Sequence, residues 1–297
     1  MHTDVIIVGG SFAGLSAAMY VARARRSVSV IDTGLPRNRF AEHSHGFFAQ
    51  DGSAPGTMLA TARAQVAAYP TVTFIHGKAE TAVKGPDSFL VALESGEVFE
   101  GSRLVLAFGI SDQLPDLLGL RERWGKSVIH CPYCHGYEFS GKRLGVLNLS
   151  PMSGHQAMMA SEWGPTTFYL NGAQSLDEAL LDQIKKRGVA IEPAPVKALH
   201  GSGTDLSAIE FEHGRMADVD ALYIAPPARL NSDIAQQLGC EGEEVPYGLI
   251  LRTDAQKMTS VPGVFAAGDI TRGSHTVAYA SADGVTAAIA AHRSLIF

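Results

Sequence analysis

Two cysteines separated by two residues form the most reactive motif of the sequence. They lie in the run H-C-P-Y-C-H at residues 130–135. Cysteines at this spacing close a small disulfide or share a metal ion, and a thiolate at a helix start beside histidines has a lowered pKa, which makes it a better nucleophile. The motif therefore predicts a redox-active pair, Cys131 and Cys134.

Two other interpretations of this pair stay open at the level of sequence. His130, Cys131, Cys134 and His135 count to the four ligands of a zinc site, but adjacent residues point apart and no second Cys/His pair lies at finger spacing. The other alternative is an inert buried pair. We predict thiol–disulfide chemistry without a metal ion, and we expect Cys240, which has no partner in sequence, to be a small core residue.

A glycine-rich turn near the N-terminus has the pattern of a nucleotide-binding site. Residues 9–14 read G-G-S-F-A-G after a β-branched run, and Asp32 ends the next expected strand. Glycines let backbone N–H groups approach a pyrophosphate at a helix N-terminus, and the acid accepts the ribose hydroxyls. Ser11 replaces the middle glycine of the usual pattern. The alternative is a glycine turn that binds no ligand.

A second glycine–acid element lies near the C-terminus. Residues 263–270 read G-V-F-A-A-G-D-I, which predicts a strand that ends in Gly268 and Asp269 before a helix of small residues. Alone it is compatible with an ordinary strand-to-helix turn. Together with the N-terminal turn it predicts FAD, with one element holding the ADP half and the other holding the ribityl chain and flavin. Gly109 ends a third, weaker flavoprotein element.

The elements that must position these residues follow a βαβ plan that occurs twice. Parallel strands joined by helices imply a doubly wound α/β sheet. We expect linkers at residues 109–115 and at the two prolines 226–227. The expected elements are strands at residues 4–10, 27–32, 72–76, 89–93, 98–99, 103–107, 142–147, 166–170, 220–225 and 263–269, and helices at 13–25, 57–69, 154–163 and 277–293.

Composition narrows the classes of protein that fit. The 297 residues are 46% hydrophobic and 18% charged, enough for two domains of roughly 100–200 residues each. The net charge of −6 argues against nucleic acid and against a membrane surface held by charge. No apolar run reaches the roughly 18 residues of a membrane helix. Three cysteines and no basic leader favour a cytoplasmic protein over a secreted disulfide scaffold.

With these motifs in this order, the chain resembles the low-molecular-weight thioredoxin reductase family. The resemblance implies two Rossmann-like, three-layer domains: an FAD-binding domain split between residues 1–112 and 229–297, and an inserted NADPH-like domain at 113–228 that carries the cysteine pair. It also implies a homodimer in which Cys134 faces the flavin and Cys131 meets the substrate.

The cofactor residues are predicted from the motifs and the resemblance together. Arg37 and Asn38 follow the ribose-binding strand, and His43 and His45 lie in the irregular segment that usually passes the flavin. The alternatives are a surface charge for Arg37 and solvated loop positions for the histidines. We predict that FAD contacts Gly9, Ser11, Phe12, Ala13, Asp32, Arg37, Asn38, His45, Gly109, Gly268, Asp269 and Val277.

The sequence departs from NADPH-dependent members at both halves of their nucleotide site. The expected glycine turn is N-L-S-P-M-S at residues 148–153, and Pro151 lacks an N–H. The cationic clamp for the 2′-phosphate is replaced by Asn171-Gly172-Ala173. The string C-P-Y-C-H-G-Y-E also resembles dithiol oxidases that form disulfides in small metabolites, and reductase-like flavoproteins with no nicotinamide donor.

These observations predict an FAD-dependent oxidoreductase that exchanges electrons with a dithiol or disulfide, either a small molecule or a thioredoxin-like protein. His135 replaces the acidic proton donor of the NADPH-dependent enzymes and titrates near neutrality, so it is the expected acid or base, with His130 as the alternative. Three other functions stay open: an NADPH-dependent thioredoxin reductase, a reductase fed by ferredoxin or a flavoprotein, and a non-enzymatic flavin-bound redox sensor.

Overall fold

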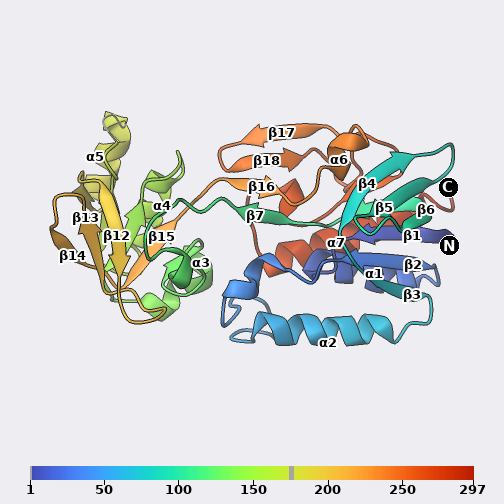
Figure 1. The fold of residues 1–297 in the computed structure, drawn as a ribbon, viewed down its shortest axis with the longest axis horizontal. Coiled ribbons are helices and arrows are strands. Elements are labelled where there is room, and N and C mark those ends of the chain that lie inside the picture. Colours follow the sequence, from blue (N-terminus) through green and yellow to red (C-terminus); the bar gives the residue numbers. More distant parts are fainter. Residues whose placement is uncertain (1, 174–176) are drawn as a thin grey trace.

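The chain forms two lobes connected by two extended crossings. The computed structural model describes residues 2–173 and 177–297. The first lobe contains both ends of the chain, and the second contains its middle part (Figure 1). The elements are mixed α and β with parallel sheets in both lobes, so the predicted α/β class is confirmed.

A seven-stranded sheet is the centre of the first lobe, in the order β3-β2-β1-β6-β5-β4 with β19 also paired to β6. β1, β2, β3, β6 and β19 are parallel, whereas β4 and β5 form an antiparallel meander with β6. The strands are β1 (His2–Val8), β2 (Val28–Asp32), β3 (Val72–His76), β4 (Ala79–Lys84), β5 (Phe89–Leu93), β6 (Val98–Leu106) and β19 (Val264–Ala266). The two short strands expected at residues 98–107 are a single strand, β6.

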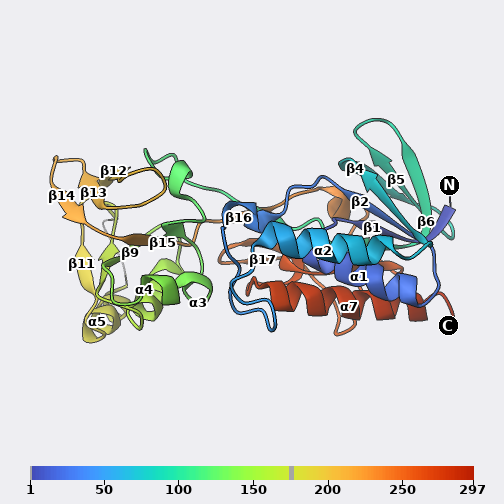
Figure 2. The same ribbon diagram turned by 90° about the horizontal axis from the view of Figure 1, so that it is seen from below.

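Three helices cover one face of this sheet, as Figure 2 shows: α1 (Phe12–Arg23), α2 (Pro55–Ala67) and α7 (Val277–Arg293). Small residues let α1 and α7 approach closely, because a Cβ on Gly284 of α7 would lie 2.0 Å from the carbonyl oxygen of Ala13. The contact joins the segments that follow the two glycine motifs, which are far apart in sequence. The core between helices and sheet is built from buried aliphatic side chains of both layers, such as Ile7, Val21 and Ala287.

The second lobe repeats the parallel plan with a five-stranded sheet in the order β11-β10-β9-β15-β8. These strands are β8 (Val128–Ile129), β9 (Leu144–Leu147), β10 (Thr166–Tyr169), β11 (Ala190–Glu192) and β15 (Ala221–Ile224). A three-stranded antiparallel sheet accompanies it, made of β12 (Val196–His200), β13 (Ala208–Phe211) and β14 (Met216–Asp218). The helices are α3 (Pro132–His135), α4 (Ser153–Ala160) and α5 (Glu178–Lys186).

Each of the two segments that connect the lobes contains a short β-strand. The expected linker at residues 109–115 contains β7 (Ile110–Asp112), which pairs antiparallel with β16 (Ala228–Leu230) just after the two prolines. A four-stranded sheet is completed by β17 (Gly242–Val245) and β18 (Gly248–Leu251), and a short helix α6 (Ile234–Gln237) follows β16. The described residues also contain four 3₁₀ turns: η1 (Arg37–Phe40), η2 (Arg121–Arg123), η3 (Tyr137–Phe139) and η4 (Asp269–Thr271). Within the described ranges, no helix combines the length and apolar character needed to cross a membrane.

Candidate functional site

A cavity of about 800 Å³ brings together residues from both lobes. Every residue predicted to bind FAD or to exchange electrons contributes to its lining, although the cysteine pair comes from the second lobe and the glycine turns from the first. Figure 1 shows why: α3 lies on the side of the second lobe that faces the first. The predicted residues at the cavity are Gly9, Ser11, Phe12, Ala13, Asp32, Arg37, Asn38, His45, Gly109, Cys131, Cys134, His135, Gly268, Asp269 and Val277.

Two glycines of the N-terminal turn leave no room for a side chain. Gly9 has a φ of +111°, and a Cβ there would lie 2.1 Å from the carbonyl oxygen of Ala107. A Cβ on Gly14 would lie 1.8 Å from the carbonyl oxygen of Gly9. Ser11 makes no side-chain cap on α1, so the N-terminus of the helix is open to the cavity. This cradle fits the pyrophosphate of FAD, which favours free N–H groups and a helix N-terminus.

Asp32 ends β2 beside this turn. Its Oδ1 accepts a hydrogen bond of 3.0 Å from the N–H of Gly10, and its Oδ2 lies 3.6 Å from the Arg63 guanidinium. The carboxylate is held against the turn and also lines the cavity. That position suits the predicted bond to ribose hydroxyls.

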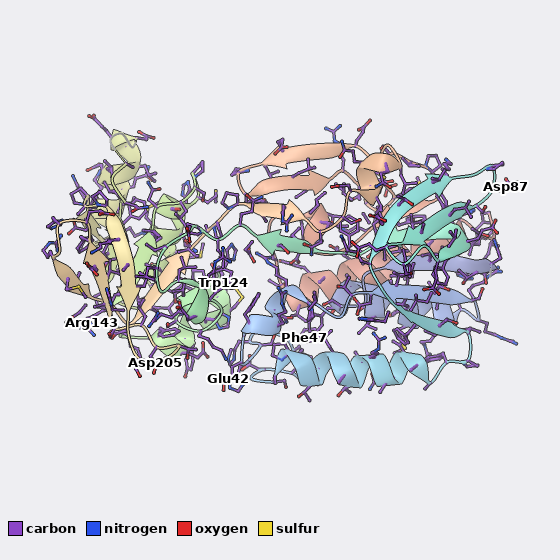
Figure 3. The ribbon with its side chains drawn as sticks, viewed as in Figure 1. Glu42, Phe47, Asp87, Trp124, Arg143 and Asp205 are labelled. Atoms are coloured by element: carbon purple, nitrogen blue, oxygen red, sulfur yellow. A yellow bond between two sulfur atoms is a disulfide. The ribbon has the colours of Figure 1, made fainter. Side chains whose placement is uncertain are left out.

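Replacing Asp32 by Ala is expected to weaken FAD retention. The ribose would lose a charged acceptor, a loss of about 1.5–3 kcal/mol, or roughly ten- to a hundredfold in Kd. The measurement is flavin release into the filtrate of a diluted holoprotein. Asp87→Ala is the matched control, because Asp87 is exposed and lies far from the cavity, at the end of the first lobe (Figure 3). Equal flavin release from both variants would contradict the role of Asp32.

Arg37 connects three parts of the fold. Its guanidinium donates to both carboxylate oxygens of Asp112, at 2.5 and 2.9 Å, and to Oδ2 of Asp269 at 3.2 Å. The ion pair with Asp112 raises the pKa of Arg37 against the opposing effect of burial and lowers the pKa of Asp112. The side chain is therefore not a free surface charge, and it links η1 to β7 of the crossing and to η4. Sequence reasoning missed Asp112 because it lies in the expected linker.

The C-terminal motif turns sharply at Gly268, whose φ is +81°. A Cβ there would lie 3.0 Å from that of Ala13, so this turn also lies against the N-terminal one. Thr276 caps α7 by accepting a hydrogen bond of 3.0 Å from the N–H of Tyr279, which places Val277 at the first helical position. The two glycine motifs thus meet at one cavity, as a ligand held at two points requires.

The cysteines form a disulfide, Cys131–Cys134. Cys131 is the N-cap of α3, and its Sγ accepts a hydrogen bond of 3.2 Å from the N–H of Cys134. Both sulfur atoms that a shared metal ion would need are bonded to each other. Among residues 2–173 and 177–297, no three His, Cys, Asp or Glu side chains gather as metal ligands. Cys240 is half-buried, and burial raises the pKa of its thiol.

The two histidines that flank the disulfide have different surroundings. Burial lowers the pKa of His135, and the charge of Glu138 acts in the opposite direction. Burial, together with the charge of Arg37, lowers the pKa of His130 to about 4. The ring of His130 lies 6.3 Å from that of His275, a cavity residue that sequence reasoning missed. The signal for His275 was its place two residues before the start of the last expected helix.

The half-buried His130 is expected to make the stability of the folded protein fall in acid. In the unfolded chain its pKa is near 6.5, whereas the folded protein lowers it to about 4. Its contribution is therefore complete above pH 6.5 and is lost as the pH falls from 6.5 toward 4, because only the unfolded chain takes up the proton. We expect the Tm of wild type to fall more steeply across this window than that of His130→Gln. Parallel Tm curves would contradict a neutral His130 in the folded protein.

The segment after β9 in the second lobe, where NADPH-dependent members have a glycine turn, makes hydrogen bonds within itself. The N–H groups of Leu149 and Ser150 both donate to Oγ of Ser153, at 3.1 Å. At the end of β10, Oδ1 of Asn171 accepts a hydrogen bond of 2.9 Å from the N–H of Val196. These two N–H groups and this side-chain oxygen are therefore engaged in contacts within the second lobe.

Comparisons with known proteins agree with this architecture. Residues 3–148 and 166–284 match the family model described as pyridine nucleotide-disulphide oxidoreductase. The crystal structure of an oxidoreductase from Agrobacterium tumefaciens is 43% identical, has a TM-score of 0.95, and is matched over 100% of this chain and 99% of that chain.

Two curated relatives are fungal. Thioredoxin reductase tcpT of Claviceps purpurea is 34% identical over 277 residues, which are 90% of this chain and 86% of that protein. Thioredoxin reductase sirT of Leptosphaeria maculans is 30% identical over 303 residues, 96% of this chain and 91% of that protein. The chain therefore belongs to the pyridine nucleotide-disulphide oxidoreductase family, as a flavin-dependent disulfide oxidoreductase of the thioredoxin reductase type with FAD as its cofactor.

Proposed function

We propose that this protein exchanges electrons between FAD and a dithiol or disulfide substrate through Cys131 and Cys134, without NADPH. The observation that carries the proposal is that the disulfide of the second lobe opens into the same cavity as both FAD-binding turns of the first. Electrons can therefore pass between the sulfur pair and the flavin within one cavity.

The exchange begins at the disulfide. A substrate thiolate attacks Sγ of Cys131, a mixed disulfide forms, and Cys134 leaves as a thiolate. A second substrate thiol loses its proton to His135 and attacks the substrate sulfur of the mixed disulfide, which releases Cys131 and a substrate disulfide. Two electrons then reside on the cysteine pair.

The pair is regenerated at the flavin side of the cavity. FAD, when bound, would supply a two-electron acceptor that an external oxidant such as oxygen can re-oxidise. Residues 9–14, Asp32, Arg37 and Gly268–Asp269 would hold the cofactor. With Cys134 on the flavin side, loss of the electron pair from the dithiol closes the Cys131–Cys134 bond again. Relative reduction potentials decide the net direction.

The absence of a usable NADPH site in the sequence supports a donor other than nicotinamide. Residues 148–153 have no glycine, and Oγ of Ser153 already accepts the N–H groups of Leu149 and Ser150. The main competing function is an NADPH-dependent thioredoxin reductase, which is favoured by the names of the two fungal relatives.

An anaerobic donor screen separates the candidate functions. Dithiol, NADPH and reduced ferredoxin are each mixed with the holoprotein, and the bleaching of flavin absorbance is followed. Rapid bleaching by the dithiol alone supports the proposal. Bleaching by NADPH supports a conventional reductase, bleaching by ferredoxin supports a ferredoxin-fed one, and no bleaching by any donor supports a redox sensor.

The proposal includes a homodimer in the cytoplasm that binds no nucleic acid. The dimer rests on the likeness to the family, and the location rests on the small number of cysteines. Sedimentation at micromolar concentration tests the dimer.

A further inference from the structure

The loop at residues 41–53, called the His45 loop here, brings a third histidine toward the redox centre. An antiparallel bridge closes it: the N–H of Ser44 donates to the carbonyl of Ser53, and the N–H of Gly52 to that of Ser44, both at 2.9 Å. Figure 3 shows Glu42 and Phe47 of this loop on the side of the first lobe that faces the second. The loop is therefore held in a defined shape against the lobe that carries the cysteines.

His45 lies between two carboxylates from different lobes. Its Nδ1 is 3.6 Å from Oδ2 of Asp51, in its own loop, and its Nε2 is 3.4 Å from Oε1 of Glu138, in η3 of the second lobe. The N–H of Gly46 fixes Asp51 through a hydrogen bond of 2.8 Å. The side chain of His45 is 21% exposed and that of Asp51 is 72% exposed. His45 and Asp51 therefore connect the cavity, which His45 lines, with the solvent, to which Asp51 is exposed.

His45 also faces the expected acid–base residue. The ring centres of His45 and His135 are 6.4 Å apart in an edge-to-face arrangement, and both rings line the cavity that holds the disulfide. Rings at this separation are suited to proton transfer through one bridging water. Glu138 lies close enough to influence both rings, since its charge opposes the burial effect on the pKa of His135. The ring of His43 is the other titratable neighbour, 6.3 Å from His45.

We propose that His45 carries protons between His135 and the solvent: its Nε2, beside Glu138, accepts a proton, and its Nδ1, beside Asp51, releases one toward the solvent. The inference rests on the proposed function, because each dithiol oxidised to a disulfide releases two electrons to the cysteine pair and flavin, and its thiol protons to the protein. The proton that His135 accepts must leave before His135 can deprotonate another thiol. His45 does not touch the sulfur atoms, so it is a positioning residue that acts through His135.

The test compares His45→Ala with wild type in anaerobic stopped-flow reduction of the bound flavin by saturating dithiothreitol. In dilute, non-imidazole buffer we expect the variant to be slower on the order of 100-fold, at the lower end of the range that acid–base groups contribute. Added imidazole should restore the rate in proportion to its concentration and should leave wild type unchanged. A side chain with only a structural role would not be replaced by a small molecule in this way.

Two further variants keep the test decisive. His155→Ala is the matched control, since His155 is exposed on α4, and it should bleach at the wild-type rate. Glu138→Gln, which keeps the shape of the side chain, should slow bleaching and alter its pH profile, and it serves if His45→Ala does not fold.

The outcomes separate this inference from the function on which it rests. If wild type is bleached by dithiothreitol and His45→Ala is bleached equally fast at every pH, the proton path is wrong while the function stands. A slow His45→Ala that imidazole does not accelerate overturns the path as well. If dithiothreitol fails to bleach wild type, the proposed function fails first.

Discussion

Cys134→Ser is expected to abolish electron transfer between dithiols and the flavin. Serine cannot form a disulfide with Cys131, and its hydroxyl is not a thiolate nucleophile near neutral pH. Cys131→Ser should also stop turnover but leave Cys134 as a free thiolate on the flavin side, visible as a long-wavelength absorption band. The measurement is anaerobic flavin bleaching by a dithiol, with the absorption spectrum recorded for each resting variant.

The chain offers its own control for these substitutions. Cys240 is a half-buried free cysteine whose Sγ donates to Oγ1 of Thr259 at 3.5 Å, and it lies outside the residues that line the cavity. Cys240→Ser can keep that hydrogen bond and should bleach like wild type. If Cys131→Ser and Cys134→Ser both retain full turnover, the pair is not the redox centre.

NADPH is expected to bind too weakly to serve as an electron donor. The N–H groups of Leu149 and Ser150 donate to Oγ of Ser153. The segment Asn171-Gly172-Ala173 has no cationic side chain for a 2′-phosphate. Each charge-assisted contact is worth about 1.5–3 kcal/mol. Losing one at each half of the site therefore weakens binding by about a hundredfold or more. The measurement is the rate of flavin bleaching against NADPH concentration.

The control for this prediction is an NADPH-dependent thioredoxin reductase treated in the same apparatus. NADH is excluded less strongly, because it does not need the cationic clamp. Slow bleaching at millimolar NADPH agrees with the prediction. Rapid bleaching at micromolar NADPH contradicts it and restores the conventional reductase as the function.

Much of the architecture could be predicted because the local signals agree with the fold. Val72–His76 and Val277–Arg293 have the expected bounds, since a β-branched run and a run of small residues each point to one structure. The glycine motifs were recognisable because a side chain at Gly9 or Gly14 would collide with backbone. Because these steric constraints act on single positions, they can be recognised from the residue types in the sequence.

The partners of the site residues could not be predicted, because they come from pairings between distant segments. Asp112 meets Arg37 only after the crossing strand β7 pairs with β16. His275 reaches His130 only when the lobes face each other. Glu138 was visible as part of the cysteine string, but nothing in the sequence placed it against His45. Neither periodicity nor composition contains information about contacts across two lobes.

The central claim is that a dithiol passes electrons through the cysteine pair to the flavin. An anaerobic titration of the holoprotein with a dithiol, read by flavin absorbance and by a thiol count at each step, tests it most directly. The account predicts that added dithiol opens the Cys131–Cys134 disulfide and goes on to bleach the flavin completely, with the substrate recovered as its disulfide. A flavin that stays oxidised while the protein disulfide is fully opened would contradict it.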